Sequence, residues 1–415
     1  MTPDPFCPRC QQPDGYCLCP PTDIPGELSG VHDAYTGWLG KDYDLGALDV
    51  VLCTAAAEQL DGDPPWLLMV GGSGAAKTET IMPLTGAGAV VISTISGEAA
   101  LLSGTAKKER AKNATGGLLR KTGRRGLLVI KDVTSILSMN RDTRALVLAA
   151  LREIYDGHWS RDVGTDGGQT LTWDGRLVVI GAVTTAWDSA YQVVSVMGDR
   201  FVLVRLDSAA HRRGAGRQAM ANVNSETAMR RELSDAAGKL LGSADAGTRI
   251  ELTEDETGAL LDLADLVTRA RTAVERDYQG NPAFAHALEM PTRFAKQLVQ
   301  IMQGGLSLGM SRRYAMTTAE RCARDTMPPL RRRVLGDIAA HPASRTAEVV
   351  KRLQLPNTTV DRVLQELHLL GLLVVDDQPW GDFGKVRWIY SLADDVSAAT
   401  LGKFTRIVSR DTEKT

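Results

Sequence analysis

Residues 66–79 read WLLMVGGSGAAKTE, an apolar run followed by a glycine-rich turn with one lysine and one threonine. A nucleoside triphosphate is bound by converging backbone N–H groups, a positive charge on its outer phosphates and a hydroxyl for Mg²⁺. The pattern G-x-x-x-x-G-K-[ST], placed between a strand and a helix, supplies these in that order. A chance glycine turn is the alternative, and the flanking strand and helix favour an ATP-binding loop. The predicted loop residues are Gly71, Gly72, Ser73, Gly74, Ala75, Ala76, Lys77, Thr78 and Glu79.

Ala76 stands where this pattern has its last glycine. Alanine tolerates helical backbone angles, so it is expected to fit if position 76 already belongs to the helix, which is predicted to begin at Ala76 or Lys77. Lys77 then supplies the positive charge, and Thr78 supplies the hydroxyl for Mg²⁺.

An acidic residue for the magnesium is expected at the end of a neighbouring strand. Asp132 ends the apolar segment GLLVIKD (126–132) and is predicted to act with Thr78, but Lys131 precedes it instead of a second acid. Where two acids are present, one holds the metal and the other orients the attacking water, so one role is unfilled here. Glu98 and Glu153 are other acids of this segment, and neither is assigned a place. The sequence therefore predicts nucleotide binding more directly than fast hydrolysis.

Composition places the chain among ordinary globular proteins. It has 415 residues, 43% hydrophobic and 24% charged, with a formal net charge of -2. This length predicts two or three domains. A nucleic-acid surface would have to be a local patch, because the chain is not a polycation. We found neither a signal-peptide core nor an apolar run near the roughly 20 residues of a membrane helix, and expect a cytoplasmic protein without a membrane partner.

Apolar strands alternate with helical segments up to about residue 208, which predicts an α/β fold with a parallel sheet covered on both faces. Residues 20–40 are rich in proline and glycine and are interpreted as a linker with short turns. Residues 225–325 are predicted to be nearly all helix. Cys53 and Cys322 fall in helical patterns and are expected to be buried.

Four further cysteines cluster near the N-terminus, in the segment CPRCQQPDGYCLC. Four thiolates in so short a segment match a tetrahedral Zn²⁺ site, in which the metal replaces a hydrophobic core. A disordered cysteine-rich segment is the alternative. The predicted zinc ligands are Cys7, Cys10, Cys17 and Cys19.

The C-terminal part has its own pattern. Three helical segments (331–341, 346–355 and 356–371) precede two strands joined by a turn, and this order predicts a winged helix. The third helix would enter a DNA major groove, and Trp380 and Lys385 mark the wing. The alternative is a winged helix that docks protein and never touches DNA. The predicted DNA-facing residues of the third helix are Asn357, Thr358, Thr359, Arg362 and Gln365.

The loop ending in alanine-lysine resembles that of the minichromosome maintenance (MCM) helicases, and the similarity continues in order. VVISTISGEAALLSG (90–104) is similar to the segment before the helix-2 insert, and YDGHWSRDVGTDGGQTLTWDG (155–175) occupies the place of the pre-sensor-1 hairpin. GAVTTAWD, VMGDRFVLVRLD and MPTRFAKQL resemble the sensor-1, arginine-finger and sensor-2 segments. The nearest layout is that of MCM-like, self-loading helicases of phages and mobile elements.

This resemblance implies an AAA+ P-loop ATPase core and roles for three further residues. Thr184 or Thr185 would stand at sensor 1, while Arg200 and Arg293 would act from a neighbouring subunit as arginine finger and sensor 2. For Arg200, a surface salt bridge is the alternative. The sequence departs from the family at Lys131, at the sensor-1 asparagine, and in lacking a large N-terminal DNA-encircling domain.

The expected organisation follows from these segments. It comprises a zinc-binding module (1–22), a linker (23–44), the AAA+ core (45–208), a helical lid with sensor 2 (209–326), a winged helix (329–395) and a tail (396–415). In a hexameric ring, the insert and the hairpin would project into a central channel and grip DNA phosphates, although a charged segment is often only a solvated loop. His158 and Trp159 could stack on bases or pack the hairpin. The predicted phosphate contacts are Lys107, Lys108, Lys112, Arg120, Lys121 and Arg161.

The sequence thus predicts an ATP-hydrolysing, ring-forming DNA helicase that uses ATP, Mg²⁺ and Zn²⁺, with DNA, itself and replication proteins as partners. One alternative is a nucleotide-gated DNA-binding loader or regulator with weak turnover, which Lys131 favours. Another is an AAA+ component of a phage-defence system.

Overall fold

The computed structural model describes residues 24–104, 115–189, 200–207, 212–380 and 385–405. Up to the end of the sheet, its elements are α1 (Gly26–Leu39), α2 (Leu45–Ala56), η2 (Ala57–Gln59), β1 (Trp66–Val70), α3 (Lys77–Ile81), η3 (Met82–Ala87), β2 (Val90–Ile92), α4 (Glu98–Leu101), α5 (Leu118–Thr122), β3 (Arg125–Ile130), α6 (Thr134–Leu137), α7 (Arg141–Tyr155), β4 (His158–Val163), η5 (Thr165–Gly167), β5 (Gln169–Asp174), β6 (Arg176–Val183) and β7 (Phe201–Arg205). They are followed by α9 (Arg212–Ala221), α10 (Glu226–Gly242), α11 (Glu254–Arg271), β8 (Val274–Arg276), β9 (Pro282–Ala285), α12 (Thr292–Ser307), α13 (Arg312–Thr326), α14 (Pro329–Ala340), α15 (Thr346–Leu353), α16 (Asn357–Leu369), β10 (Leu373–Trp380), β11 (Lys385–Leu392) and α17 (Ala398–Thr405).

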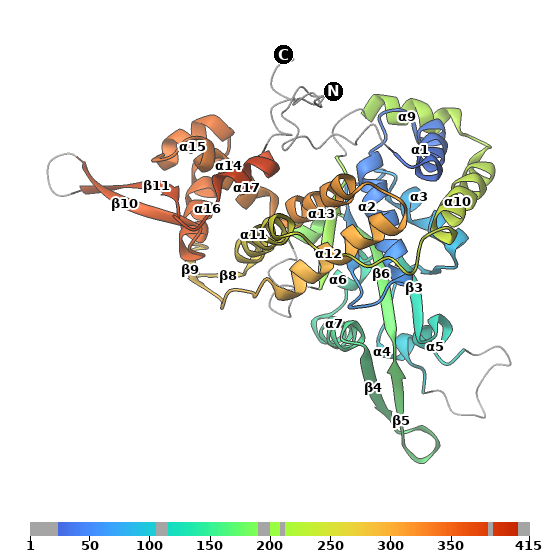
Figure 1. Ribbon diagram of the computed structural model, residues 1–415. Coiled ribbons are helices and arrows are strands. Elements are labelled where there is room, and N and C mark those ends of the chain that lie inside the picture. The colour runs from blue at the N-terminus through green and yellow to red at the C-terminus, as the bar shows by residue number, and fades with distance from the viewer. Residues whose placement is uncertain (1–23, 105–114, 190–199, 208–211, 381–384, 406–415) are drawn as a thin grey trace.

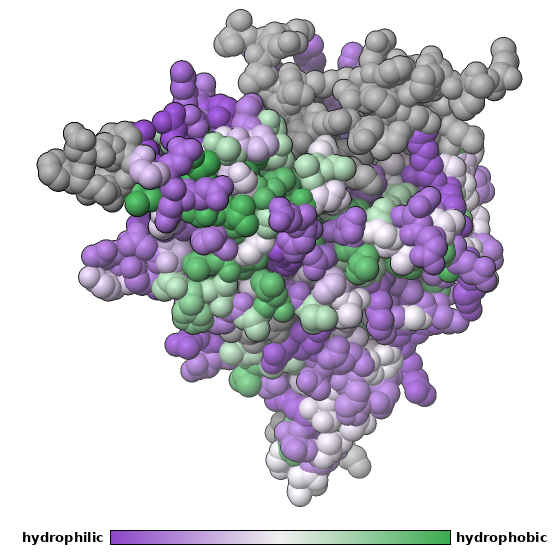
Figure 2. Space-filling view, turned by 60° about the vertical axis from the view of Figure 1, so that its left-hand side comes forward, coloured by the Kyte–Doolittle hydropathy of each residue, from purple (hydrophilic) through white to green (hydrophobic). Residues whose placement is uncertain are grey.

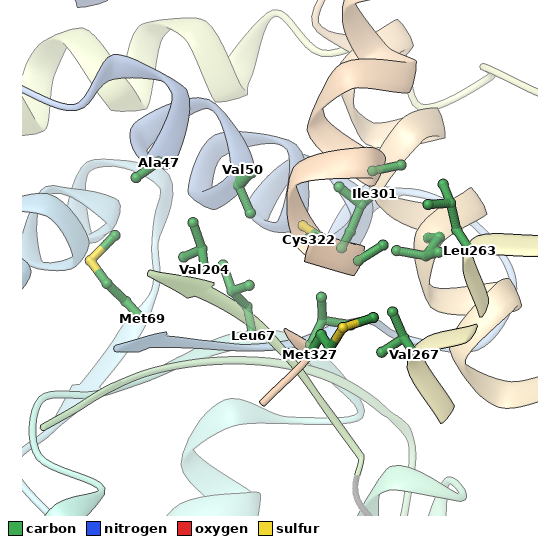
Figure 3. Close-up of a cluster of buried hydrophobic side chains, with 14 of the residues drawn as sticks. Ala47, Val50, Leu67, Met69, Val204, Leu263, Val267, Ile301, Cys322 and Met327 are labelled. Carbon is green, nitrogen blue, oxygen red and sulfur yellow. The ribbon is translucent and has the colours of Figure 1, made fainter. Parts of the chain in front are cut away.

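The centre of the molecule is a five-stranded parallel sheet with the order β2-β3-β6-β1-β7 (Figure 1). Parallel strands are buried on both faces, so their sequences are continuously apolar. In β1, Leu67 and Met69 face a core formed with α2, α10, α12 and α13. Trp66, Leu68 and Val70 face the other core, which α4 to α7 complete. Figure 3 shows the first core, with Leu67 and Met69 beside α2. The predicted α/β fold with a doubly covered parallel sheet is confirmed.

The stretch interpreted as a linker is a helix, so that prediction was wrong. Within α1, Leu28, Val31 and Tyr35 recur at helical spacing and are at most 2% exposed. Burial of this apolar stripe outweighs the weak helix propensity of the glycines in the segment. On the same helix, His32 Nε2 is hydrogen-bonded to the Asp49 carboxylate at 2.6 Å, and this contact connects α1 to α2.

Two further predictions about secondary structure need correction. The region 225–325 is interrupted by the antiparallel pair β8–β9, whose turn contains Gly280 with φ of 80°. The region described as a tail contains α17, which packs on α14 through Leu401 and Phe404, at 0% and 1% exposure. Cys53 and Cys322 are both fully buried, as expected.

A hairpin of β4 and β5 extends away from the sheet (Figure 1). Its alternating pattern places Trp159, Leu171 and Trp173 on one buried face, at 5 to 7% exposure. Trp173 donates from its indole nitrogen to the Gly123 carbonyl at 2.8 Å. These contacts fasten the hairpin to α5 and to the segment before β3.

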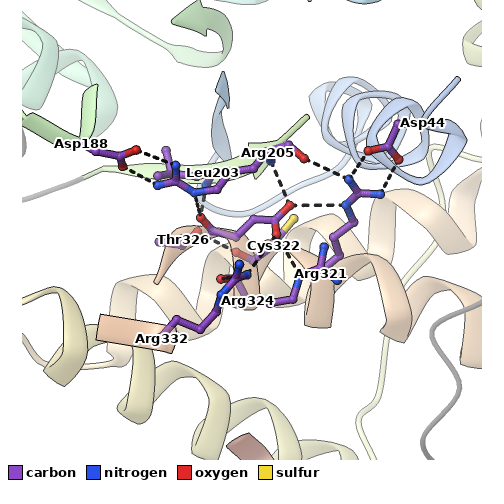
Figure 4. A network of polar contacts seen from close by, with 10 residues as sticks. Asp44, Asp188, Leu203, Arg205, Arg321, Cys322, Arg324, Thr326 and Arg332 are labelled. Carbon is purple, nitrogen blue, oxygen red and sulfur yellow. Dashed lines mark hydrogen bonds and ion pairs between the residues drawn. The ribbon is translucent and has the colours of Figure 1, made fainter. Parts of the chain in front are cut away.

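The outer edge of β7 is covered by the end of α13 (Figure 4). The backbone amide of Leu203 donates to the Thr326 hydroxyl, and the amide of Arg205 donates to the Asp325 carboxylate, both at 2.9 Å. An uncovered edge strand would offer these groups to another chain, so α13 closes the sheet on this side.

The C-terminal unit comprises α14, α15, α16 and the antiparallel strands β10 and β11. The bridge between Ser344 and Tyr390 adds a short third strand position. This order matches the three helices and two strands expected from sequence. Across the described residues, none of the helices combines the length and the apolar character that a membrane crossing requires.

Candidate functional site

The predicted nucleotide residues meet at one edge of the sheet. Gly71 follows β1, Asp132 follows β3, and Thr184 follows β6. The Gly71 amide donates to the Val183 carbonyl at 3.2 Å, and the Val133 amide donates to the Ala182 carbonyl at 2.8 Å. The carboxyl ends of parallel strands are where α/β sheets bind ligands. The sequence-predicted loop, acid and sensor-1 residue therefore lie at a common edge.

The lysine of the loop lies over the glycines that precede it. Lys77 Nζ donates to the carbonyl oxygens of Gly71 and Gly72, at 2.8 and 2.6 Å. Its partial burial lowers the pKa of Lys77, and the negative charge of Asp132 opposes that lowering. The ammonium and the carboxylate are therefore close enough for their charges to interact.

The backbone at Ala76 contradicts the expectation that it belongs to the helix. Ala76 has φ of 56° and ψ of 13°, in the left-handed region, and α3 begins at Lys77. A Cβ atom in this conformation costs roughly 1–2 kcal/mol, which is why glycine is usual here. The first turn of α3 contacts this residue, because the Thr80 hydroxyl donates a hydrogen bond to the Ala76 carbonyl at 2.9 Å. Thr80 also bonds to the Tyr43 hydroxyl at 2.7 Å.

Asp132 and Thr78 fit the requirements of Mg²⁺. The ion is usually held by one or two protein oxygens, several waters and the phosphates. Asp132 is exposed and accepts a hydrogen bond from the Thr134 amide at 3.0 Å through Oδ1. Thr78 is exposed at the start of α3. Asp132 and Thr78 would therefore hold the ion, which would supply positive charge at the outer phosphates.

Sequence reasoning missed Thr134, which lies between the acid and the sensor-1 position. Its hydroxyl accepts from the Thr184 amide at 3.2 Å and is 3.4 Å from the Thr184 hydroxyl. Because Asp132 bonds to the Thr134 amide, the acid and Thr184 are joined through this one residue. The spacing D-x-T after a buried strand was the available signal.

Glu79, the last predicted loop residue, is paired with a helix that follows the sheet. Arg230 of α10 bonds to the Glu79 carboxylate at 2.9 Å, and this contact raises the pKa of Arg230. Nothing in the sequence near Arg230 marks it for this role. The ion pair connects α3, which begins at Lys77, to α10.

Arg200 and Arg293 lie together at the opposite end of the sheet, where the parallel strands begin. Arg200 immediately precedes β7, whose Phe201 is in register with Trp66 at the start of β1. The loop follows the other end of β1, about 16 Å away at about 3.3 Å per residue. Burial lowers the pKa of Arg200, and the charge of Arg293 lowers it further. Neither arginine is therefore placed to reach a nucleotide on the loop of its own chain.

Arg200 is held in this position by its neighbours. Its guanidinium lies over the Tyr155 ring and forms an ion pair with Asp156 at 3.4 Å. Its carbonyl accepts a hydrogen bond from Gln297 at 2.6 Å. The salt-bridge alternative thus describes the contact of Arg200 within one chain, while a role toward a neighbouring chain stays a prediction.

Only part of the predicted pore surface is described. Lys107, Lys108 and Lys112 lie outside the described residues. Arg120 and Lys121 are exposed at the end of α5. These two remain candidates for phosphate contacts.

The hairpin residues have local partners. Arg161 donates to the Leu102 carbonyl at 2.9 Å and so joins the hairpin to α4. Trp159 is only 5% exposed, so the packing alternative is the correct one for this residue. His158 is exposed and paired with Asp174 at 2.7 Å.

In α16, the predicted DNA contacts differ in their surroundings. Thr358 is exposed and Thr359 is partly exposed. Arg362 donates to the Gln279 carbonyl, in the turn between β8 and β9, at 2.8 Å. The predicted zinc ligands Cys7, Cys10, Cys17 and Cys19 lie outside the described residues, and within those residues no cluster of potential metal ligands is found.

Neither a family model nor a curated protein matches the chain. Among solved structures, it is similar to the Aeropyrum pernix ORC1 protein in complex with DNA, with 15% identity, 95% of this chain and 97% of that chain covered, and a TM-score of 0.24. It is also similar to the active helicase Cch of SCCmec type IV, with 11% identity, coverage of 93% and 73%, and a TM-score of 0.33. The C-terminal region of NrS-1 gives 10% identity, coverage of 90% and 76%, and a TM-score of 0.23.

Proposed function

We propose that this chain is an AAA+ ATPase that binds ATP on the loop after β1 and acts on DNA as a ring-forming, MCM-like helicase of a phage or mobile element. The observation that carries the nucleotide site is the convergence of Lys77, Asp132 and Thr184 at the carboxyl edge of the sheet. The loop amides and Lys77 would bind the phosphates, and Asp132 with Thr78 would hold Mg²⁺.

The position of Arg200 supports assembly of several chains. An arginine that stabilises charge on a transferring phosphoryl group must reach that group, and it is often supplied by a neighbouring subunit. Arg200 and Arg293 share the sheet edge opposite the loop. A head-to-tail arrangement of subunits would bring these arginines to the next loop, and such contacts close into rings.

DNA would pass through the ring along α5 and the β4–β5 hairpin. Arg120 and Lys121 would contact phosphates, which requires positive charge and no base recognition. The helix and strand order of residues 329–395 supports a winged helix, and Cys7, Cys10, Cys17 and Cys19 would form a zinc site. Replication proteins would be its further partners.

Mixing two inactive variants tests this function. Lys77→Ala removes the phosphate charge, and Arg200→Ala removes the arginine supplied to the neighbour, so each alone should lose ATP turnover. In an equal mixture, about a quarter of the interfaces would combine an intact Lys77 with an intact Arg200, and turnover should recover to that fraction. Arg249→Ala, in an exposed ion pair with Asp61, is the matched control and should behave as wild type. Turnover that survives Lys77→Ala would rule out this nucleotide site.

A nucleotide-gated loader or regulator is the second candidate function. It is favoured by the single carboxylate at the site, because Lys131 stands where a second acid would orient water. Stimulation of ATP turnover by single-stranded DNA separates the two functions. A translocating helicase requires stimulation, whereas slow turnover that DNA leaves unchanged would favour the loader.

A further inference from the structure

The exposed face of α16 carries little positive charge. Along this helix the exposed or partly exposed positions include Thr358, Asp361, Gln365, His368 and Leu369. Gln365 donates to the Asp361 carboxylate at 2.8 Å, so the carboxylate is part of this face. A helix that enters a DNA groove meets phosphates on both sides and usually presents lysine or arginine there.

The arginines around this face are engaged within the chain. Arg331 bonds to the buried Glu366 at 3.0 Å, and Arg352 bonds to Asp337 at 2.6 Å. Arg333 and Arg362 donate to backbone carbonyls. From α14 to α16, including the residue before α15, the arginines with such internal contacts are Arg331, Arg332, Arg333, Arg345, Arg352 and Arg362. These guanidiniums are therefore engaged in contacts within the chain.

The β10–β11 hairpin adds aromatic and acidic side chains. Directly opposed residues of antiparallel strands share a face. Asp377 is opposite Trp388, and Pro379 is opposite Val386. Trp388 is 48% exposed and Val386 is 53% exposed. Figure 2 turns the left-hand side of Figure 1 forward and shows hydrophobic residues among hydrophilic ones on that side of the molecule.

Tyr390 connects this hairpin face to α16. Its ring lies 6.4 Å from the Trp388 ring in an edge-to-face arrangement, and it is fully buried. Burial raises the pKa of Tyr390, and the nearby charge of Asp361 raises it further. Among the described residues, the Tyr390 hydroxyl has no hydrogen-bond partner. Asp361, Asp377 and Trp388 therefore border one surface, with an unsatisfied polar group beneath it.

We propose that this surface, defined by Asp361, Asp377, Val386 and Trp388, binds a basic segment of a partner protein rather than DNA. The segment would place one large apolar side chain against Trp388 and Lys or Arg beside the two carboxylates. Charge complementarity selects this occupant, because a DNA backbone would bring phosphates against Asp361 and Asp377. The proposal goes beyond the ATPase function and does not depend on nucleotide.

A random peptide library displayed on phage, selected on the full-length chain without nucleotide, tests the proposal. Enriched peptides should combine an aromatic or aliphatic residue with several Lys or Arg. Trp388→Ala, or Asp361→Asn with Asp377→Asn, should weaken binding of a synthetic selected peptide about tenfold or more. Asp376→Asn is the matched control, because Asp376 is the neighbouring acid on the opposite hairpin face, and it should bind as wild type.

A labelled DNA duplex forms the second arm of this experiment. Thr358→Glu and Gln365→Glu add negative charge to the α16 face and should leave affinity of the full-length chain for the duplex unchanged. A loss of about tenfold would assign the face to DNA and overturn the proposal. Failure to enrich basic apolar peptides, or binding that ignores Asp377 and Trp388, would also overturn it. Neither result would bear on ATP turnover at Lys77.

Discussion

The Asp325 carboxylate accepts a hydrogen bond from the backbone amide of Arg205 at 2.9 Å, although 120 residues separate them. The contact joins the end of β7 to the end of α13 (Figure 4). Asp325 also bonds to Arg324 at 2.9 Å and lies 3.8 Å from Arg332 of α14. Because Arg205 is in register with Val70, which immediately precedes the loop Gly71–Glu79, this carboxylate links the end of the sheet that carries the loop to the C-terminal unit.

Replacing Asp325 with asparagine is expected to destabilise the chain strongly. Asp325 is 2% exposed, and its replacement leaves the buried Arg324 guanidinium without the counter-charge of this carboxylate, while Arg321 keeps its pair with Asp44. Breaking such a pair costs about 3–5 kcal/mol. Urea unfolding should show this loss, whereas Asp61→Asn, in the exposed pair with Arg249, should cost less than about 1 kcal/mol. Equal effects of the two substitutions would contradict a special role for Asp325.

The same carboxylate predicts a pH dependence of stability. Burial alone would raise the pKa of Asp325, but the guanidiniums of Arg324 and Arg321 outweigh it, and the pKa falls to about 2. The pKa of an aspartate in the unfolded chain is about 3.9. The stabilisation is therefore complete above pH of about 4 and is lost as the pH falls through about 2. Asp325→Asn should therefore make the free energy of unfolding less dependent on pH over this acid range.

Two adjacent alanines of the loop should respond to glycine with opposite signs. Ala76 has a positive φ and Ala75 does not. Ala76→Gly removes backbone strain and so stabilises the folded state by about 1–2 kcal/mol. Glycine also raises the conformational entropy of the unfolded chain, which lowers the free energy of unfolding by about 0.4–1 kcal/mol. Ala75→Gly has only the second effect. Thermal unfolding should thus rise modestly for Ala76→Gly and fall for Ala75→Gly, and a shared direction would show that the left-handed turn is not adopted.

The coupling of Lys77 to Asp132 should be visible in the reactivity of the lysine. Burial lowers the pKa of Lys77 and Asp132 opposes this, so Asp132→Asn should lower the pKa further. The neutral amine is the reactive form, and Lys77 should then acylate at lower pH. Competitive labelling with acetic anhydride across a pH series, read by mass spectrometry, measures this shift. Glu79→Gln is the control, because Glu79 pairs with Arg230 and its replacement should leave the reactivity of Lys77 unchanged. If Asp132→Asn also leaves the pH profile of Lys77 labelling unchanged, Lys77 and Asp132 are not coupled.

The sequence predicted the parts of the site that follow strands. Continuous apolar runs such as Trp66–Val70 occur where both sheet faces are buried, and the residues after them must then lie at one edge. This placed Gly71 and Asp132 together without a structure, and the MCM resemblance added Thr184 or Thr185. The same resemblance placed a hairpin at residues 155–175, and the structure forms it with Trp159 opposite Trp173.

Other features depend on contacts that local patterns do not encode. The glycines of α1 concealed the stripe of Leu28, Val31 and Tyr35, whose helix is stabilised by the core it enters. The left-handed turn at Ala76 is imposed by the loop, against the preference of alanine. The pairing of Glu79 with Arg230 joins segments 151 residues apart and needs the tertiary fold.

Arg120 and Lys121 provide a test of the DNA path through the assembly. Both side chains are exposed on α5, so their replacement should not disturb packing. Arg161 is left unchanged because it donates a hydrogen bond to the Leu102 carbonyl. Each phosphate contact contributes about 0.7 to the slope of log affinity against log salt for single strands. Replacing both with glutamine should reduce that slope by about 1.4 when a labelled single strand is titrated by anisotropy at several salt concentrations. Arg249→Gln should keep the wild-type slope, and an unchanged slope in the double variant would move the DNA path away from α5.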